Sequence, residues 1–430
     1  MQDPGQRSVG WYRWVICALL FFATTINYVD RAVLGILKST LMEDLSWSET
    51  DYGNIVSWFS FAYAFGYALS GRLIDVLGVR LGYGIAVALW SIAAMGHGLM
   101  RTVLGFSLMR AALGLTEGGN FPAAVKSVSE WFPKRERALA TGFFNAGSNV
   151  GVIVAPILVP WLTVSYGWPV AFYVTGGLGF VWLIFWWLAY DAPERHSAVS
   201  PEELAYIQSD PADPPAHIPW LNLLGYRQVW AFIVGMALSA PIWWFYLYWV
   251  PGFLEKQHGI DLISMGPPLI AIYLLADVGS IAGGWLSSTL IKRGWSVNAA
   301  RKTALLTCAL CVVPVFVVPL TANLWVATFL IGLAAAAHQG FSANLYTLVS
   351  DMAPRKVVSS IVGLGGMAAG FVAMGFQRLT GRILDTWTDG YMVIFLIASC
   401  AYLVNLLIIH ALTPRMEPMK IAATGAAHEP

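Results

Sequence analysis

The chain has 430 residues, of which 57% are hydrophobic and 11% are charged, and its formal net charge is +1. Soluble domains carry about 25% charged residues, so this composition is typical of a protein that crosses a membrane several times. A net charge so near zero excludes a nucleic-acid partner, because such proteins need a basic surface that neutralises phosphates.

Apolar stretches of about 20 residues, the length that crosses the hydrocarbon layer, predict an all-α integral membrane protein with twelve transmembrane helices. Six lie in the first half of the chain, near 13–37, 52–72, 82–100, 103–126, 138–160 and 169–190. Six more lie near 227–250, 267–290, 303–320, 323–349, 358–378 and 389–412. We therefore expect two six-helix bundles, 1–190 and 227–412, joined by a linker at 191–226 and followed by a tail at 413–430.

The expected linker contains Asp-Pro-Ala-Asp-Pro-Pro at 210–215, a composition typical of a connection between domains. Within it, Ser200-Pro-Glu-Glu203 has the form of a capping box with proline at the first helical position, and predicts a short surface helix. We interpret the segment as a solvated tether without chemistry.

Lysine and arginine in short loops favour the cytoplasmic side. If both termini are cytoplasmic, seventeen of the 25 basic residues lie inside, and only Lys38, Arg101, Lys256, Arg378 and Arg382 lie outside. The first apolar stretch continues past signal-peptide length without a cleavage pattern, so we expect no cleaved signal. The four cysteines all fall in apolar stretches, and we interpret them as packing residues rather than disulfides or metal ligands.

The two halves carry a weak internal repeat. Ser129-Glu130-x-x-Pro133-Lys134 and Gly142 recur as Ser350-Asp351-x-x-Pro354-Arg355 and Gly363, with a constant shift of 221 residues. Gly71-x-Leu73 recurs as Gly284-x-Leu286, with a shift of 213. Parallel six-helix repeats are the arrangement of the major facilitator transporters, in which the substrate lies between the halves near the middle of the membrane.

A loop motif strengthens this resemblance. Gly71-Arg-Leu-Ile-Asp75-Val-Leu-Gly78-Val-Arg80 resembles the superfamily's cytoplasmic signature, Gly-x-Leu-x-Asp-Arg-x-Gly-Arg-Arg, although Val76 and Val79 replace basic residues. Its glycines would let two helices approach closely, and Asp75 could pair with a basic partner as a gate. Gly71, Asp75, Gly78 and Arg80 are therefore the expected gating residues.

Two further stretches narrow the family. The first is Asn27-Tyr-Val-Asp-Arg31, and the second runs from Arg110 through Glu117 to Pro122 and on to Ala138. Both resemble the anion:cation symporters, which carry organic anions with cations. Three shorter stretches, 120–126, 291–296 and 338–344, are most similar to bacterial hexuronate transporters, which take up glucuronate and galacturonate with protons.

The resemblance implies a secondary transporter, not an enzyme, that imports a hexuronate with protons across the bacterial inner membrane by alternating access. We expect a monomer in the lipid bilayer, with a sugar acid and protons as its small-molecule partners and no cofactor. An aldonate, aldarate or other organic anion as substrate, and exchange in place of symport, remain open alternatives. No Gly-x-x-x-x-Gly-Lys-Ser/Thr loop occurs, which argues against an ATP-driven pump.

Four charges lie inside apolar stretches: Asp30, Arg31, Arg110 and Glu117. A charge at mid-membrane costs at least ~2.5–3.5 kcal/mol, so it persists facing a partner or a watery cavity. A guanidinium is shaped to bind a carboxylate through two hydrogen bonds, which makes Arg31 the first candidate substrate ligand and Arg110 the second. Asp30 and Glu117 are the proton-coupling candidates, because the proton affinity of a carboxylate depends on burial and neighbouring charge. Static salt bridges between helices are the alternative.

With the shift of 221 residues, His338 is the position in the second half that corresponds to Glu117 in the first. With the shift of 213, Trp243 and Trp244 correspond to Asp30 and Arg31. We hypothesise that the first half carries charge and proton, while the second half offers aromatic faces and hydrogen bonds, with His338 as a third proton-coupling residue. A packing histidine is the alternative. The role of Asp277 stays open. Further substrate-binding candidates, each of which could instead make an interhelical hydrogen bond, are Tyr28, Tyr63, Asn145, Asn149, Gln339, Ser342 and Asn344.

Overall fold

The computed structural model describes residues 10–209, 220–353 and 355–419, apart from the surroundings of a few residues within helices, among them Gly71 and Asp75. The predicted gating contacts of these two residues therefore lie outside the described residues. Throughout the described part, every regular element is a helix.

The first half contains eight helices: α1 (Tyr12–Ile36), α2 (Lys38–Leu45), α3 (Glu49–Leu77), α4 (Val79–His97), α5 (Val103–Glu117), α6 (Asn120–Trp131), α7 (Lys134–Tyr166) and α8 (Trp168–Ala189). The connection carries η1 (Pro193–Arg195), α9 (Pro201–Ile207) and α10 (Trp220–Leu223). The second half contains α11 (Arg227–His258), α12 (Gly266–Lys292), α13 (Val297–Val312), η2 (Val313–Leu320), α14 (Leu324–Met352), α15 (Arg355–Thr386) and α16 (Gly390–Leu412).

Helices occupy all twelve positions expected for membrane spans. Ten of them are long and apolar enough to cross a membrane, and α3 and the pair α5–α6 occupy the other two positions. The expected span 103–126 is divided into two helices at Gly118 and Gly119, residues that weaken a helix. A Cβ on Gly118 would lie 2.5 Å from the backbone of Gly66 in α3, so only glycine permits this close approach.

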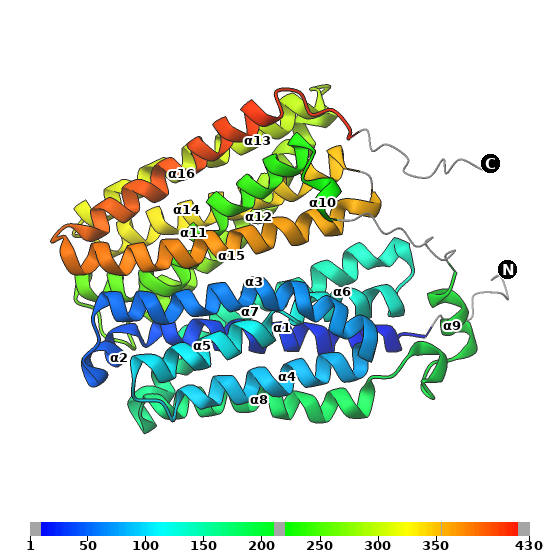
Figure 1. Cartoon of the computed structure of the whole chain (residues 1–430), viewed down its shortest axis with the longest axis horizontal. Helices are drawn as coiled ribbons and strands as arrows, with labels where there is room; N and C mark the ends of the chain where they lie inside the picture. Colours follow the sequence, from blue (N-terminus) through cyan, green and yellow to red (C-terminus); the bar gives the residue numbers. More distant parts are fainter. Residues whose placement is uncertain (1–9, 210–219, 354, 420–430) are drawn as a thin grey trace, which may run out of the picture.

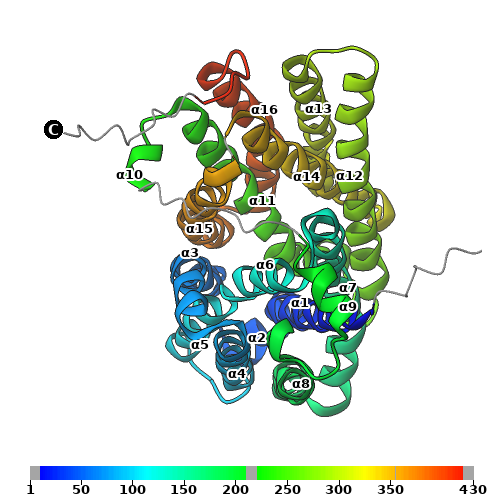
Figure 2. The same ribbon diagram turned by 90° about the vertical axis from the view of Figure 1, so that its right-hand side faces the viewer.

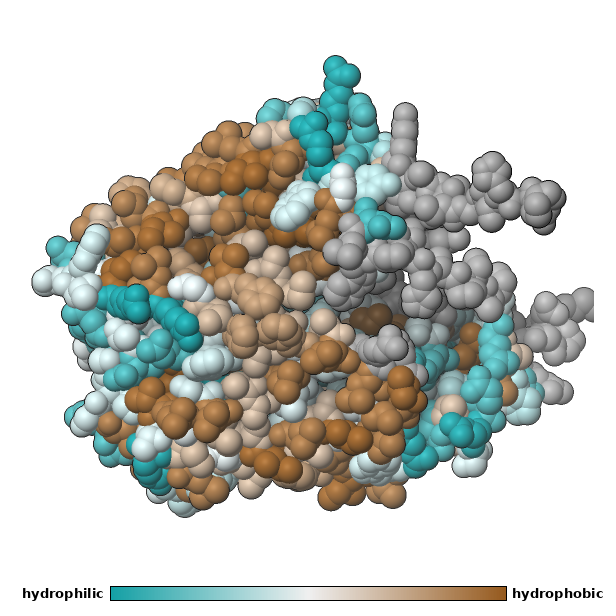
Figure 3. Space-filling model, in the orientation of Figure 1, coloured by the Kyte–Doolittle hydropathy of each residue, from teal (hydrophilic) through white to brown (hydrophobic). Residues whose placement is uncertain are grey.

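The helices are arranged in two groups. Figure 1 shows α1–α8 in its lower part and α11–α16 in its upper part, and Figure 2 shows the same two groups end-on. The N-terminal end of α1 and the C-terminal end of α16 lie at one end of the molecule, called here the termini end, and α2 lies at the opposite end, called the α2 end. Apolar residues cover much of the visible face between these ends, whereas polar residues gather at the ends themselves (Figure 3). This distribution fits a protein whose middle faces lipid.

The short helix expected in the linker is α9, and its N-cap Ser200 accepts a hydrogen bond from the Glu203 N–H at 3.1 Å. The helix is docked rather than freely solvated. Glu203 is buried and pairs with Arg13 of α1 at 3.2 Å, while Arg13 also pairs with Glu136 of α7 at 2.9 Å. The interpretation of this segment as solvated was therefore wrong at Glu203, because its composition does not reveal a buried partner.

Candidate site at Arg31 and Glu117

Helices α1 and α5 bring Arg31 and Glu117 together in the interior of the first half. Arg31 Nε donates to Glu117 Oε2 at 2.6 Å, and the two residues are 5% and 0% exposed. The pair uses one hydrogen bond only: in the described part of the chain, Arg31 Nη2 and Glu117 Oε1 have no hydrogen-bond partner. An arginine and a carboxylate can form two parallel bonds, so each member of this pair keeps a polar atom free.

Aromatic rings surround the Arg31 guanidinium. Its central carbon lies 4.9 Å from the ring centre of Tyr28, 4.6 Å from that of Tyr63 and 5.4 Å from that of Phe59. Each ring face attracts the cation electrostatically. Trp244 of α11 packs against Tyr63 and Phe59 with ring centres 5.8 and 5.7 Å apart, so the second half of the chain contacts this aromatic cage through Trp244.

Arg110 lies behind the cage rather than in it. It is fully buried, and its Nη2 donates to the backbone carbonyl of Arg31 at 3.4 Å. Its guanidinium carbon lies 5.4 Å from the Phe59 ring centre and 5.5 Å from that of Tyr248. Asp30 is 3% exposed, and neither of its carboxylate oxygens has a hydrogen-bond partner among the described residues. The four predicted charges are therefore all buried. Arg31 lies against three aromatic rings of the first half, whereas Arg110 lies against one ring from each half.

The predicted residues of the second half form a separate cluster. Trp243 stacks on His338 with ring centres 5.2 Å apart and an interplanar angle of 11°. His338 Nδ1 lies 2.6 Å from the Tyr402 hydroxyl, and its Nε2 lies 3.5 Å from Ser342 Oγ. Adjacent helical residues diverge by about 100°, which is why Trp244 reaches the cage and Trp243 does not. Among the contacts that the described residues make, none joins His338 to Arg31 or Glu117.

The remaining candidates have differing environments. Asn344 is buried, and its amide donates to the carbonyls of Gly283 in α12 and Gly340 in its own helix at 2.9 Å each. The bond to Gly283 is the interhelical bond considered as the alternative. Asn145 is exposed and Asn149 half-buried on α7, where Ser148 donates to the Asn149 side chain at 3.3 Å. Of the remaining candidates in the second half, Gln339, Ser342 and Asp277 are half-buried.

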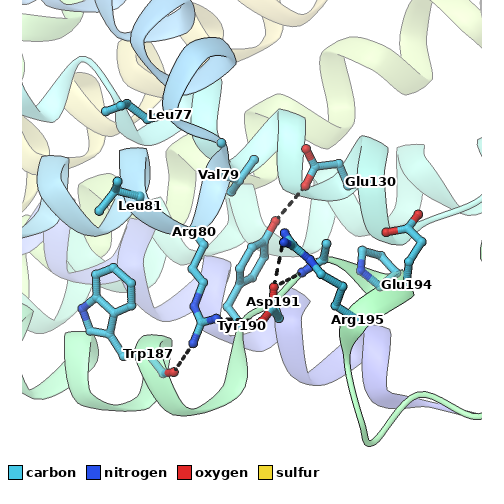
Figure 4. A pocket seen from close by; sticks show the side chains of 13 residues that line it. Leu77, Val79, Arg80, Leu81, Glu130, Trp187, Tyr190, Asp191, Glu194 and Arg195 are labelled. Carbon is cyan, nitrogen blue, oxygen red and sulfur yellow. Dashed lines mark hydrogen bonds and ion pairs between the residues drawn. The ribbon is translucent and has the colours of Figure 1, made fainter.

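The loop motif lies at the termini end. Gly78, with φ of 76°, joins α3 to α4, a backbone conformation that glycine adopts without strain. Arg80 pairs with Asp191 at 2.7 Å and donates to the Trp187 carbonyl at 3.1 Å. These residues border a pocket of about 580 Å³ (Figure 4), whose lining includes three acidic and two arginine side chains. This balance of charge does not favour an organic anion, so the pocket is a poor substrate site.

Comparison with known proteins decides the family. Residues 20–377 match the model of the Major Facilitator Superfamily. The chain belongs to the major facilitator superfamily. Over 423 residues, 97% of each chain, it is 31% identical to a protein of Escherichia coli (strain K12) named "Hexuronate transporter". It is 32% identical over 292 residues to a "Galacturonate transporter" of Dickeya chrysanthemi, covering 66% of this chain and 84% of that protein.

A solved superfamily structure agrees in fold. The D-xylose–proton symporter structure matches with a TM-score of 0.75 at 14% identity, covering 96% of this chain and all of that one. The resemblance drawn from the sequence motifs is thus confirmed, as is the all-helical major facilitator fold. The protein is a multi-pass membrane transporter similar to hexuronate transporters. The sequence did not single out Phe59 of the cage or Tyr248 beside Arg110; the one available signal was the one-turn spacing of Phe59 and Tyr63.

Proposed function

We propose that this protein is a symporter that imports a hexuronate, such as glucuronate or galacturonate, together with protons by alternating access. The observation that carries the proposal is the single-bonded Arg31–Glu117 pair inside an aromatic cage to which both halves contribute. The names of the relatives at 31–32% identity support a sugar acid as substrate.

Arg31 is the proposed ligand of the substrate carboxylate. Its free Nη2 offers a donor that Glu117 does not use, and a charge-assisted bond to a guanidinium is among the strongest that a carboxylate makes. Tyr28, Tyr63 and Trp244 supply aromatic faces against which the sugar ring can pack, as in binding sites that combine apolar walls with a few polar groups. Arg110, with no exposed surface, supports the backbone and charge of α1 rather than touching substrate.

Glu117 is the proposed principal proton carrier, with Asp30 beside it. A substrate carboxylate that binds Arg31 competes with Glu117 for the same guanidinium. A buried carboxylate that loses its cation becomes a stronger proton acceptor, so substrate binding and protonation of Glu117 favour each other. This exchange of partners couples the two fluxes without a direct contact between proton and sugar.

Both halves contribute the remaining proposed contacts. We infer that residues 1–190 and 227–412 act as two bundles around the site. In this proposal the amides and hydroxyls of Asn145 and Asn149 in the first bundle, and of Gln339 and Ser342 in the second, bind sugar hydroxyls as the bundles move. Asn344 instead holds α14 against α12 through its hydrogen bond to Gly283. His338, under Trp243, is the proposed titratable residue of the second bundle. The excess of basic residues near the termini end supports a cytoplasmic location for both termini.

The experiment is uptake by the purified protein in proteoliposomes. Labelled glucuronate, galacturonate, galactonate and glucarate are compared with and without an inside-alkaline pH gradient. We expect hexuronate accumulation that depends on the gradient. Preferential uptake of galactonate or glucarate would support the aldonate or aldarate alternative, and counterflow without gradient-driven accumulation would support an exchanger.

A further inference from the structure

Contacts at the α2 end join the two halves through a residue that the proposed function does not use. Asp385, near the end of α15, accepts the N–H of Glu49 at 2.9 Å with one carboxylate oxygen and the N–H of Thr50 at 2.7 Å with the other. Both donors belong to the first turn of α3, where backbone N–H groups lack partners within the helix and the helix dipole attracts an anion. The N-cap residue Ser48 is already engaged with Asp51, so Asp385 adds a second cap from the other half.

Two glycines place the backbones of α3 and α15 in contact beside this cap. A Cβ on Gly53 would lie 2.7 Å from the carbonyl oxygen of Gln377, and a Cβ on Gly381 would lie 3.0 Å from the Cα of Thr50. The Cβ on Gly381 would also overlap the carbonyl oxygen of Glu49. Real Cβ atoms essentially never come within 3.0 Å of another atom, so any larger residue at Gly53 or Gly381 would push the helices apart. The distance at which Asp385 reaches α3 is therefore set by these glycines.

Lys38 of α2 is a second link between the halves. The topology predicted from the sequence places Lys38 in a short loop, whereas in the structure the residue is only 2% exposed. Its ammonium pairs with Glu49 at 2.6 Å, donates to the Tyr391 hydroxyl at 3.2 Å and lies 4.9 Å from the ring centre of Trp249. A buried charge is costly without partners, and Tyr391 and Trp249 belong to the second half. When the halves separate at this end, Lys38 loses its contacts with Tyr391 and Trp249, and its ammonium becomes exposed to water.

We propose that Asp385 is a positioning residue for transport: its carboxylate, bound to the first turn of α3, holds the α2 end closed, and every cycle must release it. Lys38 is the second clamp of the same closure. The proposal rests on the alternating-access function proposed above. It differs from the superfamily's loop motif, which lies at the termini end, and it assigns to Asp385 control over how often the α2 end opens.

The test is the labelling of a cysteine that this closure buries. Ser60 of α3 is fully buried, and its carbonyl lies 3.0 Å from the Cβ position of Gly370 in α15. Ser60→Cys, in a background without the native cysteines, is labelled with a maleimide in detergent, where both ends of the protein are accessible. We expect Asp385→Asn to raise the labelling rate about tenfold, because an amide offers one acceptor in place of two and no charge to the helix dipole.

The matched control is Asp261→Asn. Asp261 lies at the same end, between α11 and α12, and accepts the backbone N–H of Ser264 at 2.7 Å within its own half. That hydrogen bond lowers the pKa of Asp261, so the control also removes a negative charge from this end. The parent is the Ser60→Cys protein without the native cysteines. We expect Asp261→Asn to leave its labelling rate unchanged. We expect the Asp385→Glu variant, which keeps the carboxylate, to be labelled more slowly than Asp385→Asn and at a rate near that of the parent.

Equal labelling of the Asp385→Asn variant and the parent, with an unchanged gel-filtration profile, would overturn the proposal. If Asp385→Asn does not fold, Gly381→Ala decides: a Cβ there forces α3 and α15 apart, so labelling must rise, and an unchanged rate would also overturn the clamp. Labelling needs no substrate. Failure of hexuronate uptake would therefore refute the proposed function alone, and unaltered labelling with intact uptake would refute the clamp alone.

Discussion

Replacement of Arg31 by lysine separates substrate binding from charge. The ammonium keeps the positive charge and the attraction of the aromatic cage, but it lacks the planar fork that binds Glu117 through Nε and leaves Nη2 for the substrate. One charge-assisted hydrogen bond is worth about 1.5–3 kcal/mol, which corresponds to roughly 10- to 150-fold in affinity. We expect Arg31→Lys to weaken glucuronate binding by that factor.

Equilibrium binding of labelled glucuronate to the purified protein at fixed pH measures this change without the complication of coupling. The matched control is Arg110→Lys, which alters a guanidinium that is fully buried and bonded to the Arg31 carbonyl at 3.4 Å. Arg110→Lys should lower thermal stability while changing affinity by less than about threefold. An Arg31→Lys variant with unchanged affinity, or a larger affinity loss in Arg110→Lys, would refute the assignment of Arg31 as the carboxylate ligand.

Three further substitutions test the other roles. Glu117→Gln removes the proposed proton carrier, so gradient-driven accumulation in proteoliposomes should be lost while counterflow persists; intact accumulation would exclude Glu117. His338→Ala should shift the pH dependence of uptake, and an unchanged profile would leave His338 as a packing partner of Trp243 and Tyr402. Asn344→Ala loses one interhelical hydrogen bond, to Gly283 of α12, and one hydrogen bond to Gly340 of its own helix; an interhelical bond is worth about 0.6 kcal/mol on average in membranes. A thermal shift assay should show a lower Tm with unchanged affinity, whereas the reverse pattern would place Asn344 in the substrate site.

Much of the fold follows from the sequence because the bilayer imposes a length on apolar segments. Helices lie at all twelve expected positions. The break between α5 and α6 was not predicted, since two glycines inside an apolar stretch are common in membrane helices and the sequence does not show that Gly118 meets the backbone of Gly66. The start of α3 at Glu49 has a local cap in Ser48 and Asp51, but the second cap there comes from Asp385, more than three hundred residues away, and was not predictable.

The candidate site was predictable as a set of residues but not as a set of contacts. Four charges inside apolar stretches were enough to locate it, because such charges are expensive in a membrane. That Arg31, rather than Arg110, pairs with Glu117 depends on the relative rotation of α1 and α5, which sequence spacing on one helix does not define. The burial of Lys38 was unpredictable for the same reason. Its partners Trp249 of α11 and Tyr391 of α16 are distant in the chain, so the sequence around Lys38 does not reveal them.

Symport itself is tested most directly by proton movement. Glucuronate is added to weakly buffered proteoliposomes without an imposed gradient, and the external pH is recorded during uptake. Proton-coupled import predicts a transient alkalinisation outside that accompanies glucuronate entry and that Glu117→Gln abolishes. Glucuronate uptake by the wild-type protein without any alkalinisation would contradict the proposed coupling.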